Sequence, residues 1–254
     1  MQATGFPARS GTVSPVFHPD RPWIRVVRLV VAVAIVAALV TNTVEAFLGI
    51  GDTTPIRLWS YFTLQSNLLL AVIFVIGAVV ARERLPLWWD TARGGAAFYM
   101  TMTGIIYVVL IAPPEEFLSW SLSWTGIVQH RIGPWAAFLD WALVWMTTRA
   151  GWKRPLSWLA YPVIFLIAAL VRGGITGWYP YHFLDPLQAG GWGGVATLTS
   201  VVVIAFLVMA VVMHLIGRLR TAVAMRDADR LGHWDHHLTA TSGPDAHEEG
   251  ADHE

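Results

Sequence analysis

The chain contains no cysteine among its 254 residues. This absence excludes disulfide bonds, zinc sites built on thiolates and catalysis by a cysteine nucleophile. Charged residues are also scarce, at 13% of the chain against about 25% in an ordinary soluble domain. The formal net charge is zero, so the composition gives no indication of nucleic-acid binding. The sequence shows no Gly-rich phosphate loop and no metal-ligand spacing, and we expect neither a cofactor nor a metal.

Apolar sequence is abundant instead. Hydrophobic residues make up 55% of the chain, which predicts one integral membrane domain. The first 23 residues lack an apolar core and are not expected to be a signal peptide. We therefore expect a cytoplasmic segment over 1–23, a transmembrane domain over 24–220 and a disordered, polar, His-containing cytoplasmic tail over 221–254.

Six stretches have the roughly 17–25 apolar residues that a helix needs to cross a bilayer. Segments rich in Gly, Pro and charge separate them, as short loops between helices require. The expected fold is an all-α bundle of six transmembrane helices. The predicted spans are Ile24–Phe47, Ser60–Ala81, Ala96–Ala112, Ile127–Thr148, Leu156–Val171 and Gly194–Ile216.

The basic residues predict the orientation of this bundle. Fourteen of the 17 Lys and Arg residues lie near the start of the first span or after the second, fourth and sixth spans. Loops that are rich in Lys and Arg stay in the cytoplasm, so both termini are expected on the cytoplasmic side of the cell membrane. The three exceptions are Arg57, Arg131 and Arg172.

Polar residues gather near the predicted outer ends of four spans. A helix rises about 1.5 Å per residue, which places these residues at a similar depth in the membrane. Hydrocarbon offers polar groups no water, so residues at one depth are expected to share a polar pocket. Each also has a simpler explanation: Thr and Asn often link membrane helices, a satisfied His can lie near the interface, and Arg can extend to headgroups. An acid within a span is a functional candidate by default. The residues are Glu45, Thr63, Asn67, His130 and Arg172.

Three further features accompany this layer. Pro134 cannot donate to the His130 carbonyl, which predicts a kink there. Asp140 lies ten residues after His130, about 15 Å deeper, and we interpret it as structural, bonded to Thr101, Thr103, Tyr99 or a water; a proton relay is the alternative. The aromatic loop over 177–186 is expected either to form an interfacial belt or to cover the polar layer.

Two motifs resemble a known family. "YFTLQSN" (Tyr61–Asn67) resembles the Thr-bearing segment of the androgen-induced-gene family, and "QHRIGP" (Gln129–Pro134) resembles its His-bearing segment. Members of that family are multi-pass membrane threonine hydrolases that cleave fatty-acid esters of hydroxy fatty acids. The resemblance implies that Thr63 is a nucleophile and His130 its base. The chain also resembles bacterial six-pass integral membrane proteins, in "LVRG" and "WYPYHFLDP".

Two functions fit these observations. A lipid-ester hydrolase would use Thr63 activated by His130, with Glu45 orienting the imidazole and Asn67 or Arg172 stabilising an oxyanion. Its substrate would enter from the outer leaflet. The alternative is a non-catalytic protein that binds or carries a lipid or an amphipathic ligand. Membrane lipids are the expected partners, and the sequence leaves the oligomeric state open.

Overall fold

The structure is a computed structural model that describes residues 17–113, 116, 122–144 and 151–241. Within these ranges, side chains are described up to residue 220 and at residue 222. Every regular element within these ranges is helical. Five helical segments are long and apolar enough to cross a membrane, as the composition predicts. They are Pro22–Phe47 (α1), Phe62–Val79 (α3), Trp89–Ile111 (α4 and a π-helical end), Lys153–Thr176 (α7 and α8) and Trp192–Arg220 (the first part of α9).

The remaining elements are short and join or interrupt these segments. Thr54 caps α2 by accepting from the Arg57 backbone N–H, and Ser123 caps α5 in the same way. The short helices are Pro55–Leu58 (α2), Trp124–Ile127 (α5), Gly133–Leu143 (α6) and Lys153–Trp158 (α7), with π-helical turns at Tyr107–Ile111 and Val128–Ile132 and 3₁₀ turns at Arg82–Arg84 and His182–Leu184. Within the long segments, α4 is Trp89–Ile106, α8 is Ala160–Thr176 and α9 is Trp192–Thr241.

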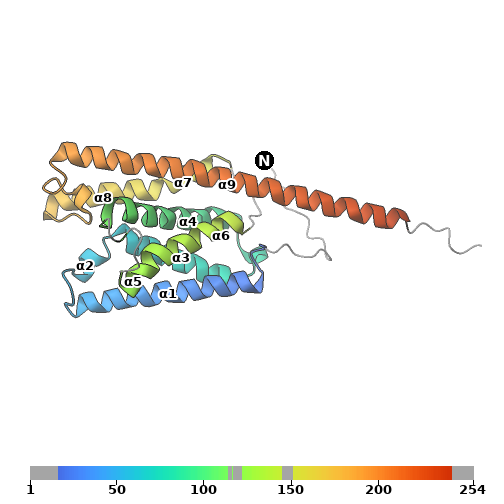
Figure 1. Cartoon of the computed structure of the whole chain (residues 1–254), viewed down its shortest axis with the longest axis horizontal. Helices are drawn as coiled ribbons and strands as arrows, with labels where there is room; N and C mark the ends of the chain where they lie inside the picture. The colour runs from blue at the N-terminus through green and yellow to red at the C-terminus, as the bar shows by residue number, and fades with distance from the viewer. Residues whose placement is uncertain (1–16, 114–115, 117–121, 145–150, 242–254) are drawn as a thin grey trace, which may run out of the picture.

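The long helices run roughly parallel to one another, and α4 lies at the centre of the bundle (Figure 1). Every residue of α4 from Arg93 to Gly104 is buried. Glycines allow its neighbours to approach closely, because a Cβ at Gly104 would lie 2.7 Å from the Pro134 Cβ. Small residues have this role at helix contacts in membrane proteins.

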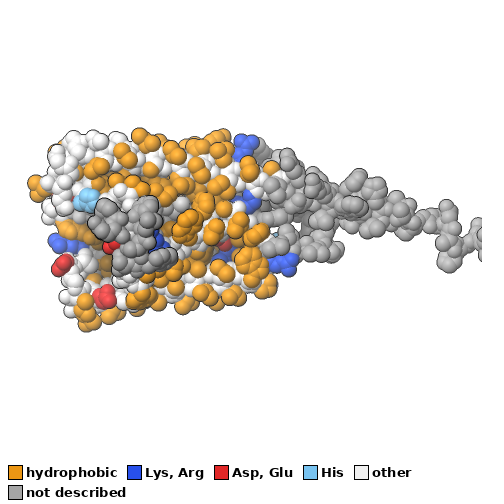
Figure 2. All heavy atoms as spheres, in the orientation of Figure 1, with side chains coloured by type: hydrophobic (Ala, Val, Ile, Leu, Met, Phe, Trp, Pro, Cys, Tyr) orange, Lys and Arg blue, Asp and Glu red, His pale blue; other side chains and the backbone are white. Residues whose placement is uncertain are grey.

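The outside of the bundle is apolar. Exposed Val, Ile and Leu side chains line α1, α8 and α9, and Figure 2 shows hydrophobic atoms over most of the visible face between its two ends. A soluble monomer rarely exposes so large an apolar surface. This distribution fits a membrane protein, in which lipid covers the outer face of each helix.

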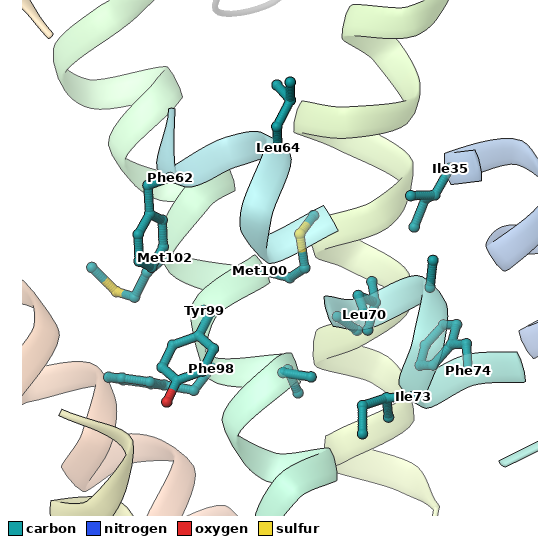
Figure 3. Packing of buried hydrophobic residues seen from close by; sticks show 14 of the residues in the cluster. Ile35, Phe62, Leu64, Leu70, Ile73, Phe74, Phe98, Tyr99, Met100 and Met102 are labelled. Carbon is teal, nitrogen blue, oxygen red and sulfur yellow. The ribbon is translucent and has the colours of Figure 1, made fainter. Parts of the chain in front are cut away.

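The core is formed largely where α3 meets α4. Figure 3 shows Phe62 of α3 beside Tyr99 and Met102 of α4. The rings of Phe62 and Tyr99 meet edge to face with centroids 6.2 Å apart, an arrangement that aromatic pairs prefer. Leu70 and Phe74 extend the same cluster toward α1. This core fixes the positions of the polar residues on α3.

The fourth predicted span is three consecutive helical pieces from Trp124 to Leu143 rather than one long helix, and it is not among the five segments above. Its predicted end, Thr148, lies outside the described residues. The predicted distortion before Pro134 is present as a π-helical turn, in which the Gly133 N–H donates to the Val128 carbonyl.

Other boundaries also differ from the predicted ones. The third span begins at Trp89 rather than Ala96, because Asp90 and Arg93 form ion pairs inside the protein and do not mark a loop. The fifth continues to Thr176. The chain over 221–241, predicted to be disordered, continues α9 as a helix. That stretch contains many good helix formers and no proline.

Candidate functional site

Thr63 begins the buried face of α3 and lines a cavity of about 140 Å³. Apolar side chains of α4, α8 and α9 form most of its wall, and Tyr181 of the aromatic loop joins them. Burial raises the pKa of Tyr181 to about 12, while hydrogen bonding with Thr63 opposes that rise. The phenol is therefore protonated at neutral pH.

His130 lies in the π-helical turn of the fourth span and faces α4. Its ring stacks on Tyr107 with centroids 3.8 Å apart. Tyr107 in turn donates a hydrogen bond of 2.8 Å to Glu116, and Arg131 donates to the Glu116 carbonyl. The His130 Nδ1 atom is buried and has no hydrogen-bond partner in the described part of the chain. It is available to a ligand or to a rearranged neighbour.

Asn67 connects the second and fourth spans, which are therefore neighbours. Its Nδ2 donates to the Thr63 carbonyl at 2.9 Å and to the Gln129 carbonyl at 3.4 Å. In an α-helix the Gln129 carbonyl would accept from the Gly133 N–H. The π turn sends that N–H to Val128 instead, which leaves the Gln129 carbonyl for Asn67.

The polar layer predicted from depth is thus divided between two places. Within the described residues, Thr63 and His130 form no direct hydrogen bond: Thr63 lines a cavity together with Tyr181, and His130 stacks on Tyr107. Asn67 is fully buried between the two places. The pairing of Thr63 with His130 stays a prediction.

Glu45 and Arg172 lie apart from these residues. Glu45 is exposed near the end of α1. Arg172 donates to the Ser60 hydroxyl and stacks over the Trp178 ring, 4.8 Å from its centroid. Tyr61 also contacts Trp178. The aromatic loop therefore packs over the start of α3 and the last turns of α8, as a covering loop would.

A larger cavity, of about 690 Å³, lies between α1 and the fourth span. It is lined along the fourth span from Arg131 to Val144, a distance of about 20 Å at the rise of a helix. Its walls are mainly apolar, and Val27 and Trp135 in them are about half exposed. The cavity is therefore open sideways, toward the lipid. Its volume lies within the range of about 300–1,000 Å³ that small-molecule pockets occupy.

Asp140 lines this cavity, and its partners differ from the predicted ones. It binds Arg28 of α1 and Arg93 of α4, each at 2.7 Å. The prediction of Thr101, Thr103 or Tyr99 was wrong, because both arginines lie inside the bundle rather than in loops. Thr101 and Thr103 donate to carbonyls of their own helix, so they need no partner at Asp140.

The ion cluster continues through the end of the fourth span. The Val144 carbonyl accepts from Arg93 at 3.2 Å and from Arg220 of α9 at 2.5 Å. Both guanidinium groups also lie over the Trp141 ring. We call Arg28, Arg93, Asp140 and Arg220 the inner arginine cluster, after the orientation that the sequence predicts for the bundle. It joins α1, α4, α6 and α9.

Sequence reasoning missed Arg28, Arg93, Tyr107 and Glu116 as site residues. Arg28 gave a signal, because it lies within the apolar run of the first span, where charge is costly unless paired. Arg93 was assigned to a loop with its neighbours. Tyr107 has no such signal, since aromatic residues are common in membrane helices.

Comparison of the chain with protein-family models, with curated proteins and with solved structures gives no match.

Proposed function

We propose that the chain crosses the cell membrane six times with both termini in the cytoplasm. The five long apolar segments support this topology, and Trp124–Leu143 supplies the remaining crossing as a broken helix. The excess of Lys and Arg on the side of the inner arginine cluster supports the orientation. The cavity that contains Thr63 then lies in the outer half of the membrane.

We further propose that the protein is a non-catalytic binder or carrier of a lipid. The observation that carries this proposal is the cavity of about 690 Å³ between α1 and the fourth span. A pocket with mainly apolar walls and a few charged residues, among them Arg28 and Asp140, matches an amphipathic ligand. Its half-exposed walls let that ligand enter from the bilayer without crossing water.

Filling this cavity is expected to remove the bound lipid. Ala136 lines the cavity, so Ala136→Phe adds a ring where the ligand would lie. Lipid that remains with the purified protein, counted by native mass spectrometry, should fall several-fold. Ala168→Phe is the matched control, because Ala168 lines a different cavity between α3 and α8. Equal lipid content in the wild type and in Ala136→Phe would contradict the proposal.

Hydrolysis of a fatty-acid ester is the second candidate function. It is favoured by the hydrogen bond from Asn67 to the Gln129 carbonyl, which holds the turn that bears His130 beside the start of α3. Catalytic hydrogen bonds are often long before substrate binds. Thr63 would be the nucleophile, His130 its base, and the wall of the smaller cavity would hold an acyl chain.

A hydrolase should lose its turnover when either partner is removed. Thr63→Ala and His130→Ala are expected to lower the rate on a fatty-acid ester in nanodiscs by about 10²–10⁴-fold, the usual contribution of a positioned base, while ligand binding persists. Thr101→Ala is the control, because that hydroxyl is bonded within its own helix. Undiminished turnover in Thr63→Ala would exclude this mechanism.

A further inference from the structure

The inner arginine cluster has more positive than negative charge. Arg28 and Arg93 bind one carboxylate, Asp140, and Arg220 binds the Val144 carbonyl to which Arg93 also donates. The nearby Asp90 carboxylate is paired with a further guanidinium, that of Arg82, so this pair adds no net charge. Three guanidinium groups and one carboxylate leave a surplus of two positive charges. Buried charge is strongly unfavourable unless it is paired.

Two of these arginines also have unused hydrogen-bond donors. Nη2 of Arg28 is buried without a hydrogen-bond partner in the described residues, and so are Nε and Nη2 of Arg220. Arg28 is 3% exposed and Arg220 8%. A buried donor left unsatisfied is unfavourable, and more so when it is charged. Both arginines therefore present donors that suit an anion.

Arg28 connects the cluster to the larger cavity. Arg28 and Asp140 are charged residues in its wall, close to the side where Trp23 and Ile24 of the first turns of α1 also line it, while Trp135 and Leu139 continue the wall along the bundle. An anionic group on that side would meet the Arg28 guanidinium. Val144, whose carbonyl Arg220 binds, lies in the same wall. A chain attached to that anion would follow the apolar wall toward Arg131.

We propose that this cavity binds an anionic phospholipid, with the headgroup phosphate at Arg28 and an acyl chain along the fourth span. The proposal rests on the lipid-binding function above and adds the class of headgroup. Guanidinium groups match the geometry of phosphate oxygens and bind them by charge-assisted hydrogen bonds. The phosphate supplies the negative charge that the cluster lacks. The apolar wall would contact an acyl chain, so the anion is expected to be part of a lipid.

The test is competition between lipids on the full chain. Purified protein is placed in equimolar phosphatidylglycerol and phosphatidylcholine, and retained lipid is identified by native mass spectrometry. We expect a preference of about tenfold for phosphatidylglycerol, which corresponds to about 1.4 kcal/mol. Arg28→Gln should abolish this preference, and Arg220→Gln should weaken it. Lys153→Gln removes an exposed positive charge from the same end of the bundle and should leave the preference unchanged.

The outcomes separate this proposal from the one on which it rests. Equal retention of both lipids by the wild type would overturn the anionic headgroup but leave lipid binding intact, whereas retention of neither would overturn both. Arg28→Lys keeps the charge but loses the guanidinium geometry, so it should keep part of the preference. A preference in Arg28→Lys that exceeds that of Arg28→Gln excludes misfolding as the cause of the Arg28→Gln result. Thermal stabilisation of lipid-free protein by inorganic phosphate, equal to that by phosphatidylglycerol, would show that a free anion occupies the site and overturn the lipid.

Discussion

Replacing Asp140 with alanine is expected to destabilise the protein more than any other single change to its charged residues. The carboxylate is bound by Arg28 and Arg93 at 2.7 Å each, and all three side chains are buried. Removal of one partner from a buried ion pair costs about 3–5 kcal/mol, because the other charge stays buried. Here two guanidinium groups would lose their carboxylate together.

Thermal unfolding in detergent, followed by tryptophan fluorescence, measures this effect. Asp140→Asn keeps the size of the side chain and should also unfold at a clearly lower temperature, since the charge is lost. Asp52→Ala is the control, because Asp52 is exposed in the loop after α1. An Asp140→Ala protein that unfolds at the wild-type temperature would show that Arg28 and Arg93 do not depend on the carboxylate.

The second large effect is expected at Gly94, in the most crowded part of α4. A Cβ at this position would lie 2.7 Å from Cζ3 of Trp141 and would also collide with Trp158. Neither ring moves easily, because the Trp141 Nε1 donates to the Met213 carbonyl and the Trp158 Nε1 to Thr91. Overpacking of a core costs about 1–3 kcal/mol.

Gly94→Ala should therefore lower the unfolding temperature in detergent, even though alanine is favoured over glycine in a helix by roughly 0.5–1 kcal/mol. Gly94→Val should lower it further. Gly174→Ala on α8 is the matched control, because nothing lies within 4 Å of the added Cβ, and it should be neutral or slightly stabilising. An unchanged or stabilised Gly94→Ala protein would show that the two tryptophan rings can move apart.

The sequence predicts the long apolar helices well, because length and hydropathy are local properties. It does less well where a charge is paired inside the bundle. From the local sequence Arg93 is predicted to lie in a loop. Its partner in the structure, Asp140, is 47 residues later in the chain. The bond from Arg28 to Asp140 joins residues 112 positions apart. No local pattern records such a pairing, so α4 was predicted to begin too late.

For the polar layer, too, the depth of each residue could be predicted from the sequence, but the contacts between side chains could not. Depth follows from counting residues along a helix, and Asn67 does face the turn that contains His130. Which side chains then meet depends on the rotation of each helix about its axis. The stacking of His130 on Tyr107 and the contact between Thr63 and Tyr181 are set by that rotation. Counting residues cannot supply it.

The π turn at Val128–Ile132 contains one more residue than an α-helical path of the same length. Each residue of an α-helix turns the chain by about 100°. The extra residue therefore rotates all later side chains of this span about the helix axis by a similar angle. The π turn therefore sets the rotation of the half that bears Asp140 relative to the half that bears His130. Deletion of one residue from this turn would rotate Asp140 away from Arg28 and Arg93 by about 100°.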